Sequence, residues 1–378
     1  MGIVTMDNNK WIDETWNKID TKLKRIAVKS RDKLPYTTIN GIHDSKVKEL
    51  DCWTNGFWGA TMWLMYSETK NEEYKTTALA ADKLLEGGLM DYKSLHHDVG
   101  FMWYITSGAE YRLTGNIRAC NKALHAAAAL AARYNINGKF IRAWNGENIA
   151  GWTIIDSMMN IPLLYWASEE TGDPSFRRIA LSHADMVLRD HLRSDGSINH
   201  VIEHDTDTGE VLSKPFTQGY NSDSCWSRGL AWAIYGITLS YIHIKKREYF
   251  EAAKRCANFF VANIVSYDYK TPIDFMAPLE PVYYDSTAGL CSACGLLELS
   301  KYVTEAEART YRDAAINVLK ATDKYFADYS EEEDALVLMG SENYPISSIK
   351  GLHIPIIYAD FFYVEAMLKL KGNDFLIW

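Results

Sequence analysis

The chain has 378 residues, of which 47% are hydrophobic and 24% are charged, a composition typical of a globular protein with a sizeable core. Its formal net charge of −9 argues against nucleic acid or an acidic membrane surface as a partner, although one arginine can still hold a small anionic substrate. The sequence shows neither a signal peptide nor an apolar run of membrane length, so we expect a cytoplasmic protein without a membrane partner.

Helical periodicity dominates the sequence, and strand signals are weak. A helix is predicted first over residues 9–27, and five segments that repeat one order of elements follow it. Each segment has an apolar helix, a short turn and an amphipathic helix. The five repeats cover residues 56–86, 99–134, 154–192, 228–264 and 286–326. A last helix over residues 358–372 can pair with the first helix as a sixth hairpin.

The turns inside the hairpins carry helix-end signals. Four of them are marked by threonines, and the fourth repeat has Lys245 near the equivalent place; the threonines are Thr69, Thr114, Thr171 and Thr304. Gly115-Asn116 and Gly172-Asp173 supply a residue that ends one helix and a residue that begins the next.

The first helix of each hairpin is apolar on nearly all sides, so we expect it inside, with the half-polar second helix outside. Six such hairpins predict an all-α fold, an (α/α)6 barrel or six-hairpin toroid, that forms one domain over residues 1–378. An open α-solenoid is the alternative, and pairing of the terminal helices favours the closed ring. The loops before the inner helices would then open at one end, where Trp, Asp, His, Gln and Arg side chains converge.

The stretch SLHHDVGFMW places His96, His97 and Asp98 side by side before the second inner helix. Adjacent residues point in different directions, and neither an HExxH pattern nor paired Cys/His spacing accompanies them, so we expect no metal. The sequence also lacks a P-loop, a dinucleotide-binding glycine pattern and a GxSxG nucleophile elbow. We therefore expect no cofactor.

Two aspartates, Asp98 and Asp156, begin successive inner helices, so both carboxyl groups are expected at the mouth of the ring. Neighbouring helices pack about 8–10 Å apart, which allows the two groups to face one ligand. Ile155 and Met158 beside Asp156 would disfavour its charged form, as a general acid requires. Read singly, each aspartate is instead a helix N-cap, a very common use of this residue.

Arg228 begins the fourth inner helix, in the stretch CWSRGLAW. It forms either a structural salt bridge or a clamp that donates two parallel hydrogen bonds to a substrate carboxylate. His200 and Gln218 lie in the loops that lead to this helix, and they are candidate substrate contacts because other candidate site residues lie in the same loops.

Six stretches in a fixed order carry a resemblance to a known family: WTNGFW, HHDVGF, IIDSMMN, SINHVIEHDTDTGE, QGYNSDSCWSRGLAWAIYG and DSTAG. With these motifs the sequence resembles the unsaturated glucuronyl hydrolases of glycoside hydrolase family 88. The resemblance implies an (α/α)6 barrel. It also implies an oligosaccharide substrate, made by polysaccharide lyases, whose non-reducing end is a Δ4,5-unsaturated uronic acid.

The resemblance also implies residue roles. Asp156 is implied as the general acid/base and Asp98 as its assistant, and we expect His97 to orient Asp98 or to line the pocket. The implied sugar contacts are Trp53, Trp144, His200, Gln218, Trp226, Arg228 and Tyr344. The implied reaction protonates C4 of a vinyl ether and adds water at C5, after which the glycosidic bond breaks.

Three departures from the family concern the substrate. The late loop PISSIK keeps Ser348 and Lys350 of a pattern with which some relatives contact a sulfate, but Pro345 replaces its first serine. Thr217 stands where relatives often carry Arg or His, and Tyr358 stands where they tend to carry Trp.

The predicted partners are therefore unsaturated uronic-acid-containing oligosaccharides, with glycosaminoglycan disaccharides foremost, and the predicted assembly is a monomer or weak oligomer. The near alternative is a hydrolase for unsaturated rhamnogalacturonyl fragments of pectin. Two more distant alternatives are a sugar epimerase or inverting glycanase on the same barrel, and a non-catalytic carbohydrate-binding barrel.

Overall fold

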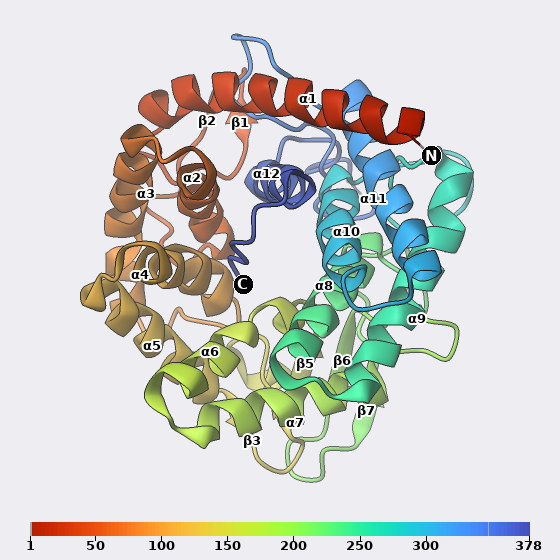
Figure 1. The fold of residues 1–378 in the computed structure, drawn as a ribbon. Helices are drawn as coiled ribbons and strands as arrows, with labels where there is room; N and C mark the ends of the chain where they lie inside the picture. The colour runs from red at the N-terminus through yellow and green to blue at the C-terminus, as the bar shows by residue number, and fades with distance from the viewer. Residues whose placement is uncertain (1, 347) are drawn as a thin grey trace.

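The fold is a ring of helices inside a second ring of helices, seen in a computed structural model that describes residues 2–346 and 348–378 (Figure 1). The inner segments are, in chain order, α2 (Gly56–Thr69), η3 with α4 (Gly100–Gly108 and Ala109–Thr114), η5 with α6 (Ile155–Met159 and Pro162–Thr171), α8 (Ser227–Ile244), α10 (Ser286–Leu299) and α12 (Ile357–Lys371). The outer helices are α1 (Gly2–Lys29), α3 (Glu72–Leu85), α5 (Ile117–Ala131), α7 (Pro174–Asp190), α9 (Arg247–Ile264) and α11 (Glu305–Tyr325).

The ring is closed by the helices from the two ends of the chain. In Figure 1, α12 completes the inner ring, where it packs against both α10 and α2. The long helix α1 lies outside it and contacts both α12 and α3. The predicted sixth hairpin and the (α/α)6 barrel are therefore confirmed, and the open solenoid is wrong.

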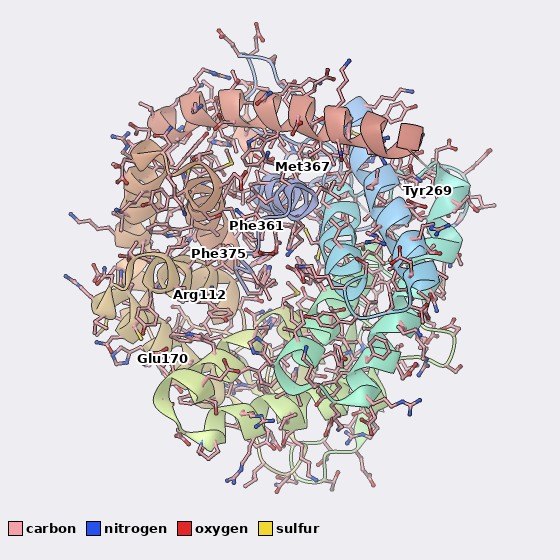
Figure 2. All side chains as sticks on the ribbon, viewed as in Figure 1. Arg112, Glu170, Tyr269, Phe361, Met367 and Phe375 are labelled. Carbon is pink, nitrogen blue, oxygen red and sulfur yellow. The ribbon has the colours of Figure 1, made fainter. Side chains whose placement is uncertain are left out.

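Burial follows the predicted division between inner and outer helices. Every side chain of α10 is buried, whereas α9 buries one face and exposes the other. Side chains fill the interior of the ring (Figure 2), and Phe361 and Met367 of α12 are both 0% exposed. The segment after α12 turns into the centre, where the Trp378 ring lies 5.8 Å from the Phe101 ring, centroid to centroid. Apolar burial of this extent is what stabilises the ring.

Three of the predicted turns share one hydrogen-bond pattern. Thr69, Thr114 and Thr171 end their inner helices, and each hydroxyl donates to the carbonyl oxygen four residues earlier. Each hydroxyl also accepts the N–H of the residue two positions later, which is the N-cap of the next outer helix. Thr304 differs, because it is itself the N-cap of α11 and forms a capping box with Glu307.

Short strands occur in the loops at the site end. They form three small sheets, of which two are antiparallel pairs of two-residue strands: β1 with β2 (Thr38–Ile39 and Ile42–His43) and β3 with β4 (Tyr134–Asn135 and Phe140–Ile141). The third is an antiparallel sheet of β5 (Trp152–Ile154), β6 (Val201–His204) and β7 (Val211–Ser213), in the order β5-β6-β7. Within the described residues, no helix has both the length and the apolar character needed to cross a membrane.

Candidate active site

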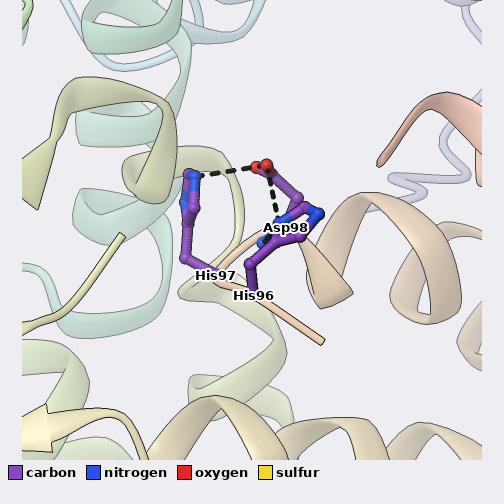
Figure 3. Close-up of side chains that lie close together, drawn as sticks. All are labelled: His96, His97 and Asp98. Atoms are coloured by element: carbon purple, nitrogen blue, oxygen red, sulfur yellow. Dashed lines mark hydrogen bonds and ion pairs between the residues drawn. The ribbon is translucent and has the colours of Figure 1, made fainter. Parts of the chain in front are cut away.

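Asp98 lies at the entrance to η3 and is held by two histidines (Figure 3). Its Oδ2 lies 3.2 Å from His96 Nδ1 and 3.2 Å from His97 Nε2. His96, which had no predicted role, is fixed in turn by its Nε2, 3.1 Å from the Asp51 carbonyl oxygen. Burial alone would raise the pKa of Asp98, but His97 and His96 hold that pKa well below its usual range. The carboxyl group is therefore kept in its charged form.

His96, His97 and Asp98 also form a group of metal-ligand type, with ligand atoms within 4.8 Å of one another. Each oxygen of the carboxylate already has a partner in the chain, because Oδ2 contacts the two rings and Oδ1 accepts a hydrogen bond from Asn160. These contacts account for the grouping without an ion, and the expectation of no metal stays a prediction.

Asn160 joins the segment of Asp98 to the segment of Asp156. Its Nδ2 donates to Asp98 Oδ1 at 3.0 Å and to the Asp156 carbonyl oxygen at 3.3 Å. Its Oδ1 accepts the N–H of Phe101 at 2.8 Å. The approach requires glycine at position 100, because a Cβ on Gly100 would lie 2.7 Å from both Cα and Oδ1 of Asn160. The two aspartates thus share one amide as their link.

Neither aspartate serves as a helix cap. The N-cap positions of η3 and η5 are Val99 and Ile154, and neither helix has a side-chain hydrogen bond at its cap. Asp156 lies inside the first turn of η5, immediately after strand β5. The alternative that both aspartates are N-caps is therefore wrong.

The three-stranded sheet brings Asp156 and His200 together. The N–H of Ile155 donates to the His200 carbonyl oxygen at 3.1 Å, which extends the pairing of β5 with β6. Asp156 Oδ1 lies 3.5 Å from His200 Nε2 without forming a hydrogen bond. Thr217 Oγ1 lies 2.6 Å from the other ring nitrogen, Nδ1, and fixes the ring. When the threonine donates to Nδ1, Nε2 carries a proton and faces the carboxylate.

Buried His191 supports this arrangement from behind. Its Nε2 lies 2.9 Å from Thr153 Oγ1 on β5, and its Nδ1 lies 2.9 Å from the Asn199 carbonyl oxygen, next to His200. Burial lowers the pKa of His191 to about 4, so the ring is neutral near pH 7. One neutral ring thus bridges the strand before Asp156 and the residue before His200.

Arg228 forms the salt bridge that the sequence allowed. It is 2% exposed, and its Nη1 donates to Asp285 Oδ2 at 2.9 Å and to the Ser341 carbonyl oxygen at 2.6 Å. Its Nη2 donates to the Glu342 carbonyl oxygen at 3.0 Å. The guanidinium also lies 4.5 Å above the centroid of the Trp226 ring, a cation–π contact. The role of a substrate clamp stays a prediction.

Charge around Arg228 includes the second aspartate. Burial alone would lower the pKa of Arg228, but Tyr358, Asp285 and Asp156 raise it. Asp156 is therefore close enough to interact electrostatically with the guanidinium.

Two hollows that share lining residues open at this end of the ring; Arg228 lines the inner one and Thr217 the outer one, whereas neither aspartate lines either. The inner one has a volume of about 320 Å³ and is lined by Tyr36, Lys46, Cys52, Trp53, Gln218, Arg228, Glu342, Asn343 and Tyr358. The outer one has a volume of about 460 Å³ and is lined by Phe216, Thr217, Glu342, Asn343, Tyr344, Ile346, Ser348 and Lys350. Glu342 and Asn343 line both hollows and stand where the inner one meets the outer one.

The predicted site residues fall into this arrangement by contact. The Trp53 ring lies 5.0 Å from the Tyr358 ring, and the Trp144 ring lies 6.1 Å from the His97 ring. The His200 ring lies 4.3 Å from the Trp226 ring. The residues of the late loop, Tyr344, Ser348 and Lys350, line only the outer hollow.

Several buried polar atoms of this region find no hydrogen-bond partner among residues 2–346 and 348–378: His97 Nδ1, Asp156 Oδ1, His200 Nε2 and Trp226 Nε1. Each such atom costs about 1–3 kcal/mol when it is left unpaired. A ligand with hydroxyl and carboxylate groups carries the donors and acceptors that such atoms can pair with.

Sequence reasoning assigned no role to several residues of the site. Asn160 stood within the quoted motif IIDSMMN, and Asp285 stood within DSTAG, so the motifs contained a signal for both. Tyr36 and Glu342 lie outside every quoted motif, and nothing in the sequence alone indicated them. Their hydrogen bond, from the Tyr36 hydroxyl to Glu342 Oε1, joins residues 306 positions apart.

Comparisons with known proteins agree on one family. The model of Glycosyl Hydrolase Family 88 matches residues 22–268. The unsaturated glucuronyl hydrolase of Bacillus sp. (strain GL1) is 33% identical, over 92% of this chain and 93% of its own. The unsaturated chondroitin disaccharide hydrolase of Streptococcus agalactiae serotype III (strain NEM316) is 32% identical, over 90% of this chain and 86% of its own. A solved structure of a mutant Streptococcus agalactiae unsaturated glucuronyl hydrolase with dGlcA-GalNAc6S has a TM-score of 0.82 and 28% identity, over 97% of this chain and 93% of its own.

Proposed function

This chain belongs to glycosyl hydrolase family 88, and from this premise we propose that it removes a Δ4,5-unsaturated uronic acid from the non-reducing end of lyase-generated oligosaccharides. Unsaturated glycosaminoglycan-type disaccharides are the proposed substrate class. The chondroitin disaccharide hydrolase among its relatives supports this class, and so does a cavity lined by aromatic rings and one arginine.

The observation that carries the proposal is the unequal state of the two aspartates. Asp98 is held in its charged form by two histidines and an amide, so it is a poor proton donor at neutral pH. Asp156 Oδ1 has no hydrogen-bond partner among the described residues and lies 3.5 Å from His200 Nε2, and its carboxyl group interacts electrostatically with Arg228, which lines the inner hollow. The division supports Asp156 as the group that exchanges a proton with the substrate and Asp98 as a fixed negative charge.

The proposed reaction is the hydration of a vinyl ether. Asp156 donates its proton to C4, and the electron pair of the C4=C5 bond forms the new C4–H bond. The positive charge left at C5 is shared with the ring oxygen, and Asp98 stabilises it electrostatically. A water molecule adds at C5 and gives its proton to Asp156, which restores the acid. The hemiketal opens to a ketone, C1 becomes a hemiacetal, and the second sugar leaves from it.

The proposal gives the remaining polar groups defined tasks. Arg228 and Gln218, which both line the inner hollow, bind the carboxylate on C5. His200 donates from Nε2 to Asp156 or to a ring hydroxyl. Trp53, Trp144 and Trp226 present ring faces and edges to the sugar.

The test is a panel of unsaturated disaccharides and pectin fragments, followed through the ultraviolet absorbance of their C4=C5 bond. We expect the absorbance to disappear with at least one unsaturated glucuronyl disaccharide. Asp156→Asn should lower kcat about 10²–10⁴-fold while substrate binding remains. Asp313→Asn, an exposed carboxyl of outer helix α11, is the matched control and should keep full activity.

Two results would overturn the proposal. Absorbance that persists across the whole panel excludes the reaction. An Asp156→Asn variant that cleaves as fast as the parent chain removes Asp156 from its role, and a chain that only binds sugars would be the better description.

A further inference from the structure

Glu342 occupies the junction of the two hollows, and its backbone is held by the site itself. Its carbonyl oxygen accepts hydrogen bonds from Arg228 Nη2 at 3.0 Å and from Gln218 Nε2 at 2.9 Å. Its N–H donates to the Gly351 carbonyl oxygen at 2.8 Å. The residue is therefore fixed by the same side chains that line the cavity for the first sugar.

The carboxyl group of Glu342 is fixed as well. The Tyr36 hydroxyl donates a hydrogen bond to Oε1. Gly351 lies against the other oxygen, since a Cβ there would be 2.3 Å from Oε2, and its φ of +76° also favours glycine. Burial raises the pKa of Tyr36, so the phenol remains a donor and the Glu342 carboxyl remains its acceptor. A half-buried acidic side chain thus stands at the passage between the hollows.

The cations near this passage are mostly engaged elsewhere. Arg228 is paired with Asp285 at 2.9 Å, and Lys46 is paired with Glu49 at 3.1 Å. Lys350 lies in the outer hollow but is exposed, so its charge is well screened by water and salt. A fixed, half-buried carboxylate acts more strongly on a nearby ligand group than an exposed, flexible ammonium does.

We propose that Glu342 is a specificity-determining residue that makes the site favour substrates whose second sugar carries no negative charge. This inference rests on the proposed function, which places the unsaturated uronic acid in the inner hollow and the next sugar in the outer one. A carboxylate accepts hydrogen bonds from the hydroxyl or amide groups of a neutral sugar, whereas it repels a sulfate or a second carboxylate.

The experiment compares kcat/KM for two unsaturated disaccharides that differ only in a sulfate on the second sugar. The parent chain should prefer the unsulfated one. Glu342→Gln keeps the shape and the acceptor for Tyr36 but removes the charge, and it should shift the ratio of the two kcat/KM values about tenfold toward the sulfated substrate. Glu332→Gln removes the same charge from an exposed loop position and should leave the ratio unchanged.

One further measurement keeps the test decisive. Salt should narrow the preference of the parent chain, because it screens the repulsion, and this measurement needs no variant. If the parent chain cleaves neither disaccharide, the proposed function fails. If it cleaves them but Glu342→Gln leaves the ratio unchanged, the assignment of Glu342 is wrong, and a ratio that salt does not change excludes charge repulsion as its cause.

Discussion

The buried ion pair of Arg228 and Asp285 offers the sharpest test of how the site is held together. Asp285 is 0% exposed, and its oxygens also accept the hydroxyl of Thr287 at 2.6 Å and the N–H of Ser341 at 3.3 Å. The substitution Asp285→Asn keeps the size of the side chain and removes its charge. It leaves the guanidinium buried with carbonyl oxygens as its main remaining partners.

The size of the effect follows from that geometry. Removal of one partner from a buried ion pair costs about 3–5 kcal/mol, because the other charge stays uncompensated. The carbonyl oxygens of Ser341 and Glu342 keep two hydrogen bonds to Arg228, which places the expected loss near the lower end, at about 3 kcal/mol. KM for the unsaturated disaccharide should also rise, since the arginine loses its main anchor.

A double-mutant cycle, measured by urea unfolding, gives the interaction free energy between Arg228 and Asp285. The variants are Asp285→Asn, Arg228→Met and the double mutant, and each gives a free energy of unfolding. Because the double mutant leaves no buried charge unpaired, it should be less destabilised than the sum of the single variants, by about 2 kcal/mol. Additive single effects, or an Asp285→Asn variant as stable as the parent chain, would refute the reasoning.

Two other predictions concern the supports of the aspartates. Asn160→Ala leaves the buried N–H of Phe101 without an acceptor and Asp98 without an amide donor. The free energy of unfolding measured in urea should therefore fall by about 3 kcal/mol, and kcat should fall more than KM rises. An unchanged kcat would contradict the proposed link between the two aspartates. The pKa of His191 is lowered by burial from 6.5 to about 4, so its contribution to stability is present above pH 6.5 and is lost as the pH falls toward 4. Between pH 7 and pH 5 this loss amounts to about 2 kcal/mol, and His191→Gln should flatten the pH dependence of unfolding by that amount, whereas an unchanged slope would contradict it.

The fold could be predicted because its signals are local. Apolar helices that alternate with amphipathic ones need no knowledge of distant partners, and the Thr–Gly–Asn and Thr–Gly–Asp turns fix where the inner helices of the second and third hairpins end. The sheet β5-β6-β7 could not be predicted, because its strands have three or four residues and their pairing depends on segments far apart in the sequence. Thr304 shows a related limit: threonine can end the first helix of a hairpin or cap the second, and the sequence alone did not distinguish the two positions.

The site was predictable where a motif or a charged residue marked it, and not where a tertiary contact created it. Asp98, Asp156 and Arg228 stand at the starts of inner helices, so their common location follows from the ring. The second histidine on Asp98 and the link through Asn160 appear only when the segments are placed. The pair of Tyr36 with Glu342 depends on a contact between the two ends of the chain, for which the sequence carries no pattern.

The site also shows how stability is divided between support and reaction. The supporting groups have hydrogen-bond partners within the chain, as in the amide of Asn160 and the carboxylate of Asp285. The atoms proposed to meet the substrate, Asp156 Oδ1 and His200 Nε2, are buried and have no hydrogen-bond partner among the described residues. A substrate that pairs with these atoms binds the folded chain and not the unfolded one, so a saturating, non-hydrolysed analogue should raise the unfolding temperature of the parent chain. The stabilisation should be smaller in His200→Ala, because one of the unpaired atoms is then absent before the ligand arrives.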